Sequence, residues 1–256
     1  MGGTRRSATL AWLGFALLAL LAATGWSVLT DVDAAVADRF HRFGTDHPGW
    51  VATMHGVTLL GTGWVLVATN VVAVAICLRT SRYRAALLCA GAALCTWYST
   101  QLAKSLTSRA RPTDAFWPVD GFAFPSGHTS SAAAAAGVAV IAGWPLVQAH
   151  RRGRIALLGV AIAWPLLVGL SRMAGGVHWA SDVVGGWLLA LGWLTALAAL
   201  ADRFAPDGRA TPDDRATPGD LLVPGDEALS DPAAARSGRS RIPRASRARR
   251  YPRRSV

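Results

Sequence analysis

A histidine and an aspartate stand four residues apart near the end of the apolar part of the chain. His178 and Asp182 lie in the stretch SRMAGGVHWASD, which begins at Ser171. Residues four apart share one face of a helix, so the carboxylate can accept a hydrogen bond from one imidazole nitrogen. The other nitrogen then keeps its lone pair and can act as a nucleophile. Taken alone, such a pair is also typical of an ordinary polar helix start, so its chemistry depends on its neighbours.

Three basic side chains accompany this pair, each near the end of an apolar run. They are Arg111, Arg172 and Lys104, which is the only lysine in the chain. A single cation at such a place is usually an anchor whose charge reaches the membrane surface. Three of them, each beside a turn that contains glycine or histidine, instead predict a bound anion. We interpret nearby Arg109 as a solvated loop residue, with a second charge for the substrate as the alternative.

The stretch FPSGHTSS, residues 124–131, predicts a cradle for that anion. Pro125 disfavours helix at the residue before it and Ser126 is a favoured N-cap, so a helix is expected to start here. Gly127 lets backbone approach a ligand closely, and free amides at a helix start bind phosphate. His128 places a second imidazole beside them. The alternative is an ordinary capped helix with a polar first turn.

Long apolar runs must position these residues. The chain has 256 residues, of which 52% are hydrophobic and 16% charged, whereas soluble proteins carry about 25% charged residues. Each run is close to the ~20 residues that a helix needs to cross a bilayer. The runs cover residues 8–29, 51–78, 85–104, 127–148, 155–172 and 180–201. Because only helices satisfy their own backbone groups there, we predict an all-α bundle of six transmembrane helices, with a break at 61–63.

Arginines in the short connections predict the orientation of this bundle. They precede the first run and follow the second and the fourth: Arg5, Arg6, Arg79, Arg82, Arg84, Arg151, Arg152 and Arg154. Basic residues favour the cytoplasmic side, so both termini are expected in the cytoplasm. The connections 30–50, 105–126 and 173–179 then lie outside the cell membrane, together with the candidate site. The run 8–29 is too long for a typical signal peptide and is interpreted as a retained helix, with cleavage as the alternative.

The net charge of +11 comes from the end of the chain. Residues 236–256 contain nine arginines and no acid, and the remaining residues carry only +2. Nucleic-acid binding by the main body is therefore not expected. Residues 203–256 show no apolar period, which predicts a disordered cytoplasmic tail that is either simply solvated or attracted to anionic lipids. Residues 1–202 are the expected membrane-embedded domain.

Together, the three polar stretches resemble the signature of the type 2 phosphatidic acid phosphatase superfamily. This group includes integral-membrane lipid phosphatases, soluble acid phosphatases and vanadium haloperoxidases. The residues that carry the resemblance are Lys104-x6-Arg111-Pro112, Pro125-Ser126-Gly127-His128 and Ser171-Arg172-x5-His178-x3-Asp182. The resemblance covers about residues 50–202, and it implies an active site at the extracytoplasmic helix ends.

The resemblance implies that five residues bind the phosphate oxygens. These are Lys104, Arg111, Arg172, Ser126 and the amide of Gly127. No metal or other cofactor is expected, because three cations can neutralise the charge that a metal ion neutralises in other phosphoryl-transfer sites.

The other three matched residues would carry the chemistry. His178 would attack phosphorus and form a phosphohistidine, while Asp182 fixes its tautomer. His128 would protonate the leaving oxygen and then activate the water that clears the intermediate.

The implied function is hydrolysis of a lipid phosphate or diphosphate at the outer leaflet. Substrate candidates are phosphatidic acid, phosphatidylglycerol phosphate and polyprenyl diphosphates such as undecaprenyl diphosphate, the last favoured slightly by the outward site. Alternatives are a vanadate-dependent haloperoxidase, a lipid phosphotransferase with the same residues, and a non-catalytic binder or transporter of anionic lipid. The expected partners are the bilayer and the lipid substrate, and the pattern does not specify a number of subunits.

Overall fold

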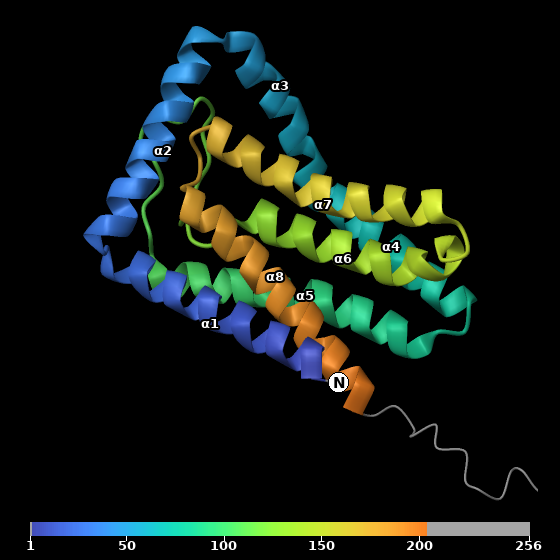
Figure 1. Cartoon of the computed structure of the whole chain (residues 1–256). Coiled ribbons are helices and arrows are strands. Elements are labelled where there is room, and N and C mark those ends of the chain that lie inside the picture. The colour runs from blue at the N-terminus through green and yellow to red at the C-terminus, as the bar shows by residue number, and fades with distance from the viewer. Residues whose placement is uncertain (1, 204–256) are drawn as a thin grey trace, which may run out of the picture. The chain divides into compact units, whose positions relative to one another are not determined.

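The computed structural model describes residues 2–203, which form eight α-helices and one short 3₁₀ helix without any strand. The elements are α1 (Gly2–Thr24), α2 (Ser27–Asp46), α3 (Pro48–Thr58), η1 (Leu59–Gly61), α4 (Gly63–Arg79), α5 (Tyr83–Thr107), α6 (Gly127–Val147), α7 (Arg151–Ala174) and α8 (Ala180–Arg203). The predicted all-α class is confirmed (Figure 1). Apart from Arg203, the predicted tail lies outside the described residues.

Five helical segments among the described residues are long and apolar enough to cross a membrane. They are Gly3–Thr24, Pro48–Arg79, Gly127–Val147, Arg151–Ala174 and Ala180–Arg203. The predicted count of six is therefore approximate. Helix α5 is 25 residues long but carries several polar side chains, and it packs along α4, α6 and α8 in the bundle. The predicted break in the second run is present, because η1 separates α3 from α4.

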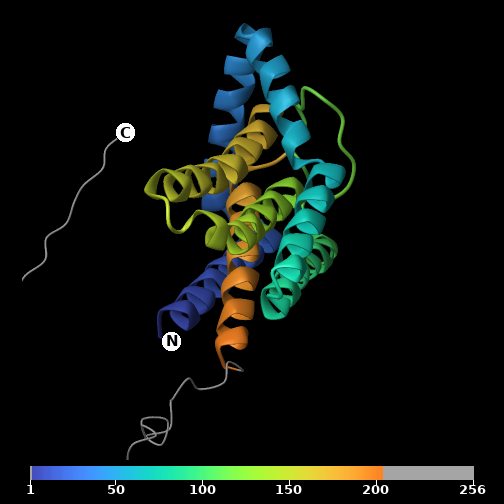
Figure 2. The same ribbon diagram turned by 90° about the vertical axis from the view of Figure 1, so that its right-hand side faces the viewer.

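Helix α2 corrects the prediction that residues 30–50 are a connection. The segment is helical from Ser27 to Asp46 and contacts both α7 and α8. In Figures 1 and 2, α2 and α3 form a hairpin that projects beyond the other helices. The segment has no long apolar run, but Val32, Val36 and Phe40 recur every four residues, which is the period of a helix with one apolar face.

Helix α6 lies at the centre of the bundle and contacts α4, α5, α7 and α8. Its first half is rich in alanine, and Ala132, Ala134, Ala135 and Ala136 are all buried. Small residues allow helix backbones to approach closely, and the resulting van der Waals contacts help to hold helices together in a membrane. At Gly137 an added Cβ would lie 2.4 Å from a methyl carbon of Leu194 on α8. The central helix is therefore closely surrounded and can hold its first turn in a fixed place.

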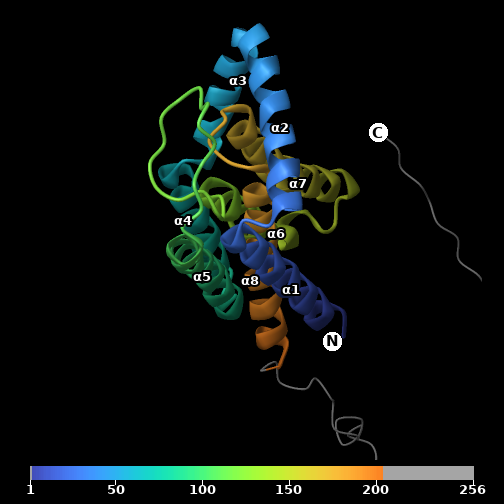
Figure 3. The same ribbon diagram turned by 90° about the vertical axis from the view of Figure 1, so that its left-hand side faces the viewer.

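The connections of the bundle lie at two opposite ends. In Figure 1, the α4–α5 and α6–α7 turns lie at the right, while α5 and α7 end, and α6 and α8 begin, at the left. Figure 3 looks onto this second end, where α2 and the long α5–α6 connection lie in front of the bundle. The two ends differ in chemistry, because the arginine-bearing turns are at the first and the predicted site residues are at the second.

Candidate functional site

All eight predicted site residues lie at one end of the bundle, on or beside four different helices (Figure 1). Lys104 is in the last turn of α5 and Arg111 follows in the α5–α6 connection. Ser126 precedes α6, whose first two residues are Gly127 and His128. Arg172 is in the last turn of α7, His178 lies between α7 and α8, and Asp182 is in the first turn of α8.

His178 and Asp182 contact each other in the buried interior. Nδ1 of His178 lies 3.3 Å from Oδ2 of Asp182, and the two residues are 3% and 0% exposed. The same Oδ2 accepts a hydrogen bond from the backbone N–H of Trp179 at 2.8 Å, which fixes the carboxylate. With Nδ1–H directed at Asp182, the lone pair of His178 is on Nε2.

Several positive charges act on His178. Burial lowers its pKa well below the ordinary value of 6.5, and the nearby charges of Arg111, Arg172 and Lys104 lower it further. Burial disfavours the charged form of an imidazole, and like charges add to that cost. His178 is therefore neutral at pH 6.5, where an exposed histidine is about half protonated, and a nucleophile must be neutral.

None of these three cations has a carboxylate partner within the described part of the chain. Lys104 Nζ donates to the carbonyl of Phe122 at 2.5 Å, and Arg111 donates to the carbonyls of Gly121 and Val177 at 2.8 and 2.6 Å. Arg172 is 3% exposed and donates to Thr58 Oγ1 at 2.8 Å.

The electrostatics of these cations favour an anion. The Nε of Arg172 is buried without a hydrogen-bond partner among the described residues. A buried charge is normally paired, so the buried Arg172, together with the half-buried Lys104 and Arg111, is suited to a bound oxyanion. Burial also lowers the pKa of Arg111, although the Asp182 carboxylate partly opposes this.

Arg109 is different, and the interpretation of it as a solvated loop residue is wrong. Its side chain is 8% exposed and lies between two buried carboxylates. Nη1 donates to Asp182 Oδ1 at 2.8 Å, and Nη2 donates to Asp33 Oδ2 at 2.7 Å. The partners of Arg109 therefore set it apart from the three unpaired cations.

The start of α6 differs in detail from the expected cap. Ser126 occupies the N-cap position but makes no side-chain capping hydrogen bond. Its Oγ instead accepts from the hydroxyl of Thr129 at 2.9 Å, while its backbone N–H donates to the carbonyl of Asp182 at 3.0 Å. Lys104 lies close by, since its Cε is 3.9 Å from where a Cβ on Gly127 would be. The ammonium of Lys104 and the first amides of α6 are thus on the same side of the site.

His128 is held by a segment that sequence reasoning did not connect with the site. A Cβ added at Gly61 would lie 3.0 Å from Cδ2 of His128 and 2.8 Å from Cγ1 of Val168. Thr58, one turn earlier, contacts Arg172. The end of α3 and η1 therefore pack behind both an imidazole and a cation of the site.

Sequence reasoning missed Asp33, Ser181 and Thr58. Asp33 is 2% exposed on α2, where its oxygens accept from the backbone of Ser181 and from Arg109. It was missed because its segment was interpreted as a connection. The helical recurrence of apolar residues on either side of Asp33 is the signal that could have revealed a buried acid. No comparable local signal distinguishes Thr58 or Ser181.

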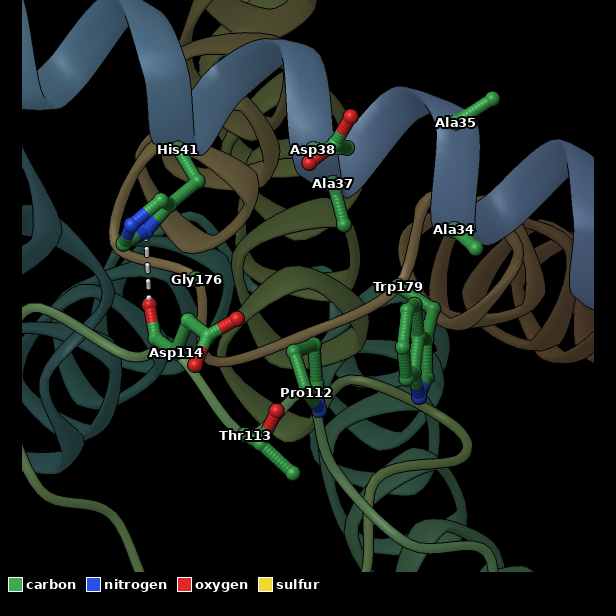
Figure 4. Close-up of a pocket in the computed structure, with 10 residues that line it drawn as sticks. All are labelled: Ala34, Ala35, Ala37, Asp38, His41, Pro112, Thr113, Asp114, Gly176 and Trp179. Atoms are coloured by element: carbon green, nitrogen blue, oxygen red, sulfur yellow. Dashed lines mark hydrogen bonds between the residues drawn. The ribbon is translucent and has the colours of Figure 1, made fainter.

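A pocket of about 380 Å³ lies on the α2 side of the two connections that carry Arg111 and His178 (Figure 4). Asp38 and His41 of α2 line one wall, and Trp179 lines the other. None of the eight predicted site residues lines it. The pocket therefore borders the site loops from outside and is not the place where the cations converge.

Comparison with known proteins adds a family model described as the PAP2 superfamily, which matches residues 82–205. Phosphatidylglycerophosphatase B of Escherichia coli strain K12 and that of Shigella flexneri are each 42% identical over 64 residues. That alignment covers 25% of this chain and 23% of each relative, so the chain spans about a quarter of the length of the curated relatives it matches.

A solved structure shares the fold. The transmembrane PAP2-type phosphatidylglycerolphosphate phosphatase from Bacillus subtilis superposes with a TM-score of 0.66 at 24% sequence identity. The superposition covers 77% of this chain and 97% of that one. Together with the apolar helices, this likeness identifies a multi-pass membrane protein.

Proposed function

We propose that the chain belongs to the PAP2 superfamily, whose family model matches residues 82–205, and that it hydrolyses a lipid phosphate or diphosphate by way of a phosphohistidine. The observation that supports this most strongly is the set of unpaired cations around the neutral, buried imidazole of His178. Lys104, Arg111 and Arg172 all act on that imidazole electrostatically. A phosphate group would supply the negative charge that the described residues do not.

Attack begins with a change of partner by Arg111. Its Nη1 lies 3.1 Å from Nε2 of His178 and occupies the side from which phosphorus must approach. A bound phosphate oxygen is a better acceptor for a guanidinium than a neutral imidazole. Arg111 therefore donates to the phosphate, together with Lys104 and Arg172, and the Nε2 lone pair becomes free.

The reaction then proceeds in two displacements. Nε2 of His178 attacks phosphorus, the bond from phosphorus to the leaving oxygen breaks, and protonated His128 gives its proton to that oxygen. The first product is a lipid alcohol from a monophosphate, or a lipid monophosphate from a diphosphate. His128 can carry that first proton because the bound phosphate offsets the charges of the three cations. In the second step His128 takes a proton from water, which attacks phosphorus and releases inorganic phosphate and free His178.

The distribution of arginine supports an outward-facing site in the cell membrane. The turns that contain Arg82 and Arg152 lie at the end of the bundle opposite the site (Figure 1). Short basic connections favour the cytoplasm. We therefore place the chemistry at the outer leaflet, where a lipid headgroup meets the helix ends while its chains stay in the bilayer.

The test is release of inorganic phosphate by the purified full chain in detergent. The panel contains phosphatidylglycerol phosphate, which the names of the relatives suggest, phosphatidic acid and a polyprenyl diphosphate. We expect turnover of at least one of them, with no turnover by His178→Ala and no inhibition by EDTA. A radiolabelled substrate should leave acid-labile, base-stable label on the wild-type chain and none on His178→Ala.

Two results would contradict the proposal. Retained turnover in His178→Ala would exclude the covalent mechanism, and loss of turnover after chelation would show that a metal is required. Halide oxidation with vanadate and peroxide, in a chain that releases no phosphate from the panel, would instead favour the haloperoxidase alternative.

A further inference from the structure

We infer that Asp33 and Arg109 are positioning residues that hold Asp182, and through it His178, in the geometry for attack. The inference rests on the proposed function, because it assigns these two residues to the nucleophile of that reaction. Neither residue belongs to the group of cations assigned to phosphate, which are Lys104, Arg111 and Arg172. They act from the opposite side of Asp182, and Asp33 is supplied by α2, outside the segment that matches the family.

A continuous chain of contacts links Asp33 to His178. Asp33 Oδ2 accepts from Arg109 Nη2 at 2.7 Å, and Arg109 Nη1 donates to Asp182 Oδ1 at 2.8 Å. The other carboxylate oxygen of Asp182 faces Nδ1 of His178. The two oxygens of the Asp182 carboxylate can accept about four hydrogen bonds. Arg109 donates to Oδ1, and the imidazole of His178 contacts Oδ2. Fixing one oxygen limits rotation of the carboxylate and so orients the second.

Asp33 also caps the helix that carries Asp182. The residue before α8 is Trp179, whose carbonyl accepts the first helical hydrogen bonds but whose side chain has no capping oxygen. A capping side chain normally accepts from the second or third amide of its own helix. Here Asp33 Oδ1 accepts from the N–H of Ser181, the second residue of α8, at 2.9 Å. Its charge is favourable at this position, because a helix start carries partial positive charge.

The charges explain why Arg109 needs a second carboxylate. Arg109 paired with Asp182 alone would cancel the negative charge that stabilises the developing positive charge on His178 during attack. With Asp33 included, two carboxylates and one guanidinium carry a net charge of −1. Ser181 completes the group, since its hydroxyl accepts from Arg109 at 2.7 Å and donates to Asp33. Asp182 thus remains effectively anionic toward the imidazole while it is held in place.

The experiment uses Asp33→Asn, Arg109→Gln and the double variant in the full chain. Asparagine keeps an oxygen for the Ser181 amide, so Asp33→Asn removes the charge and leaves the cap. We expect each single change to lower kcat by about 10- to 100-fold, as loss of an outer partner of a reactive group does. KM and inhibition by orthovanadate should stay within about 3-fold, because the three phosphate-binding cations are untouched.

The double variant tests whether the two residues act through one network. Removing both charged groups leaves the single negative charge of Asp182. The kcat of the double variant should therefore equal or exceed that of Arg109→Gln, whereas two independent effects would multiply. The control is Asp38→Asn on the same helix. The side chain of Asp38 is 60% exposed and forms an ion pair only with Arg42 among the described residues. This substitution removes the same charge and should leave kcat unchanged.

A measurement without turnover separates this inference from the proposed function. In histidine-labelled protein, ¹⁵N NMR should show His178 protonated on Nδ1 in the wild type and in Asp38→Asn, with a mixture of tautomers in Asp33→Asn and Arg109→Gln. An unchanged His178 spectrum, or an unchanged kcat with only a lower melting temperature, would overturn the inference. A wild-type chain that releases no phosphate would defeat the proposed function, while the NMR result would still decide the role of Asp33 and Arg109.

Discussion

Four basic side chains lie near His178 and Asp182, and they are of two kinds, which differ in their hydrogen-bond partners. Arg109 has two carboxylate partners, whereas Lys104, Arg111 and Arg172 donate only to carbonyl or hydroxyl oxygens among the described residues. Arg172 is buried, whereas Lys104 and Arg111 are half-buried. Leaving a buried cation without a counter-charge is costly, so Arg172 in particular marks a place where a ligand supplies the charge. The three unpaired cations are those assigned to phosphate, and the paired one is assigned to Asp182.

The state of His178 gives a prediction at the same scale. Because burial and three cations lower its pKa well below 6.5, the folded chain binds this proton less readily than the unfolded chain. The unfolding free energy contributed by this group therefore falls as the pH falls below 6.5. We expect the NMR signals of His178, assigned by their loss in His178→Gln, to titrate with a midpoint below 6.5 in ligand-free protein. A midpoint at or above 6.5 would contradict this.

Close helix packing places these side chains, and glycines permit it. Helix α8 approaches the start of α6 so closely that a Cβ on Gly186 would lie 2.9 Å from the carbonyl oxygen of Ser126. Gly61 allows η1 to pack against His128 in the same way. The second imidazole is thus positioned by a segment that lies between α3 and α4, far from it in sequence.

Gly61→Ala should therefore displace His128 or Val168 by a few tenths of an ångström or more. Since a misplacement of about 1 Å can cost about 100-fold in rate, we expect kcat to fall by about 10-fold or more. The matched control is Gly56→Ala in α3, where nothing lies within 4 Å of the added Cβ. Steady-state phosphate release measures both variants, and equal rates for the two would show that η1 does not position His128.

At the scale of the whole molecule, residues 2–203 contain everything that the proposed chemistry uses. The contacts described for the site extend from Asp33 on α2 to Asp182 on α8. The basic turns between α4 and α5 and between α6 and α7 lie at one end of the bundle and the candidate site at the other (Figure 1). Short connections rich in arginine favour the cytoplasmic side of a membrane, so the basic turns are expected to face the cytoplasm.

Truncation tests this division of the chain. Since α8 runs to Arg203, a stop codon after that residue removes residues 204–256 and keeps every helix of the described part of the chain. Tolerance to truncation depends on the contacts that are lost, and we expect kcat/KM in detergent to stay within about 3-fold of the full chain. A loss of 10-fold or more would assign the removed segment a part in catalysis or folding.

The sequence by itself determined the all-α class and most of the helix positions. Apolar runs of about 20 residues admit only helices in a membrane, so length and composition are enough to predict them. The sequence also indicated the candidate catalytic and phosphate-binding residues, because they lie in three short polar stretches at the ends of those runs. His178 and Asp182 are four residues apart, and they do meet, although His178 lies just before α8 and not on the helix that carries Asp182.

Tertiary structure alone decided which polar groups are partners. Asp33 meets Arg109 across 76 residues and the Ser181 amide across 148, and no local pattern selects those pairs. The helix α2 itself was missed, because its apolar residues form no continuous run, and it is recognised only from its contacts with α7 and α8. Local periodicity depends on near neighbours in the chain, whereas the pairing of buried charges depends on which helix ends meet in space. The distinction between Arg109 and the three unpaired cations follows from that packing.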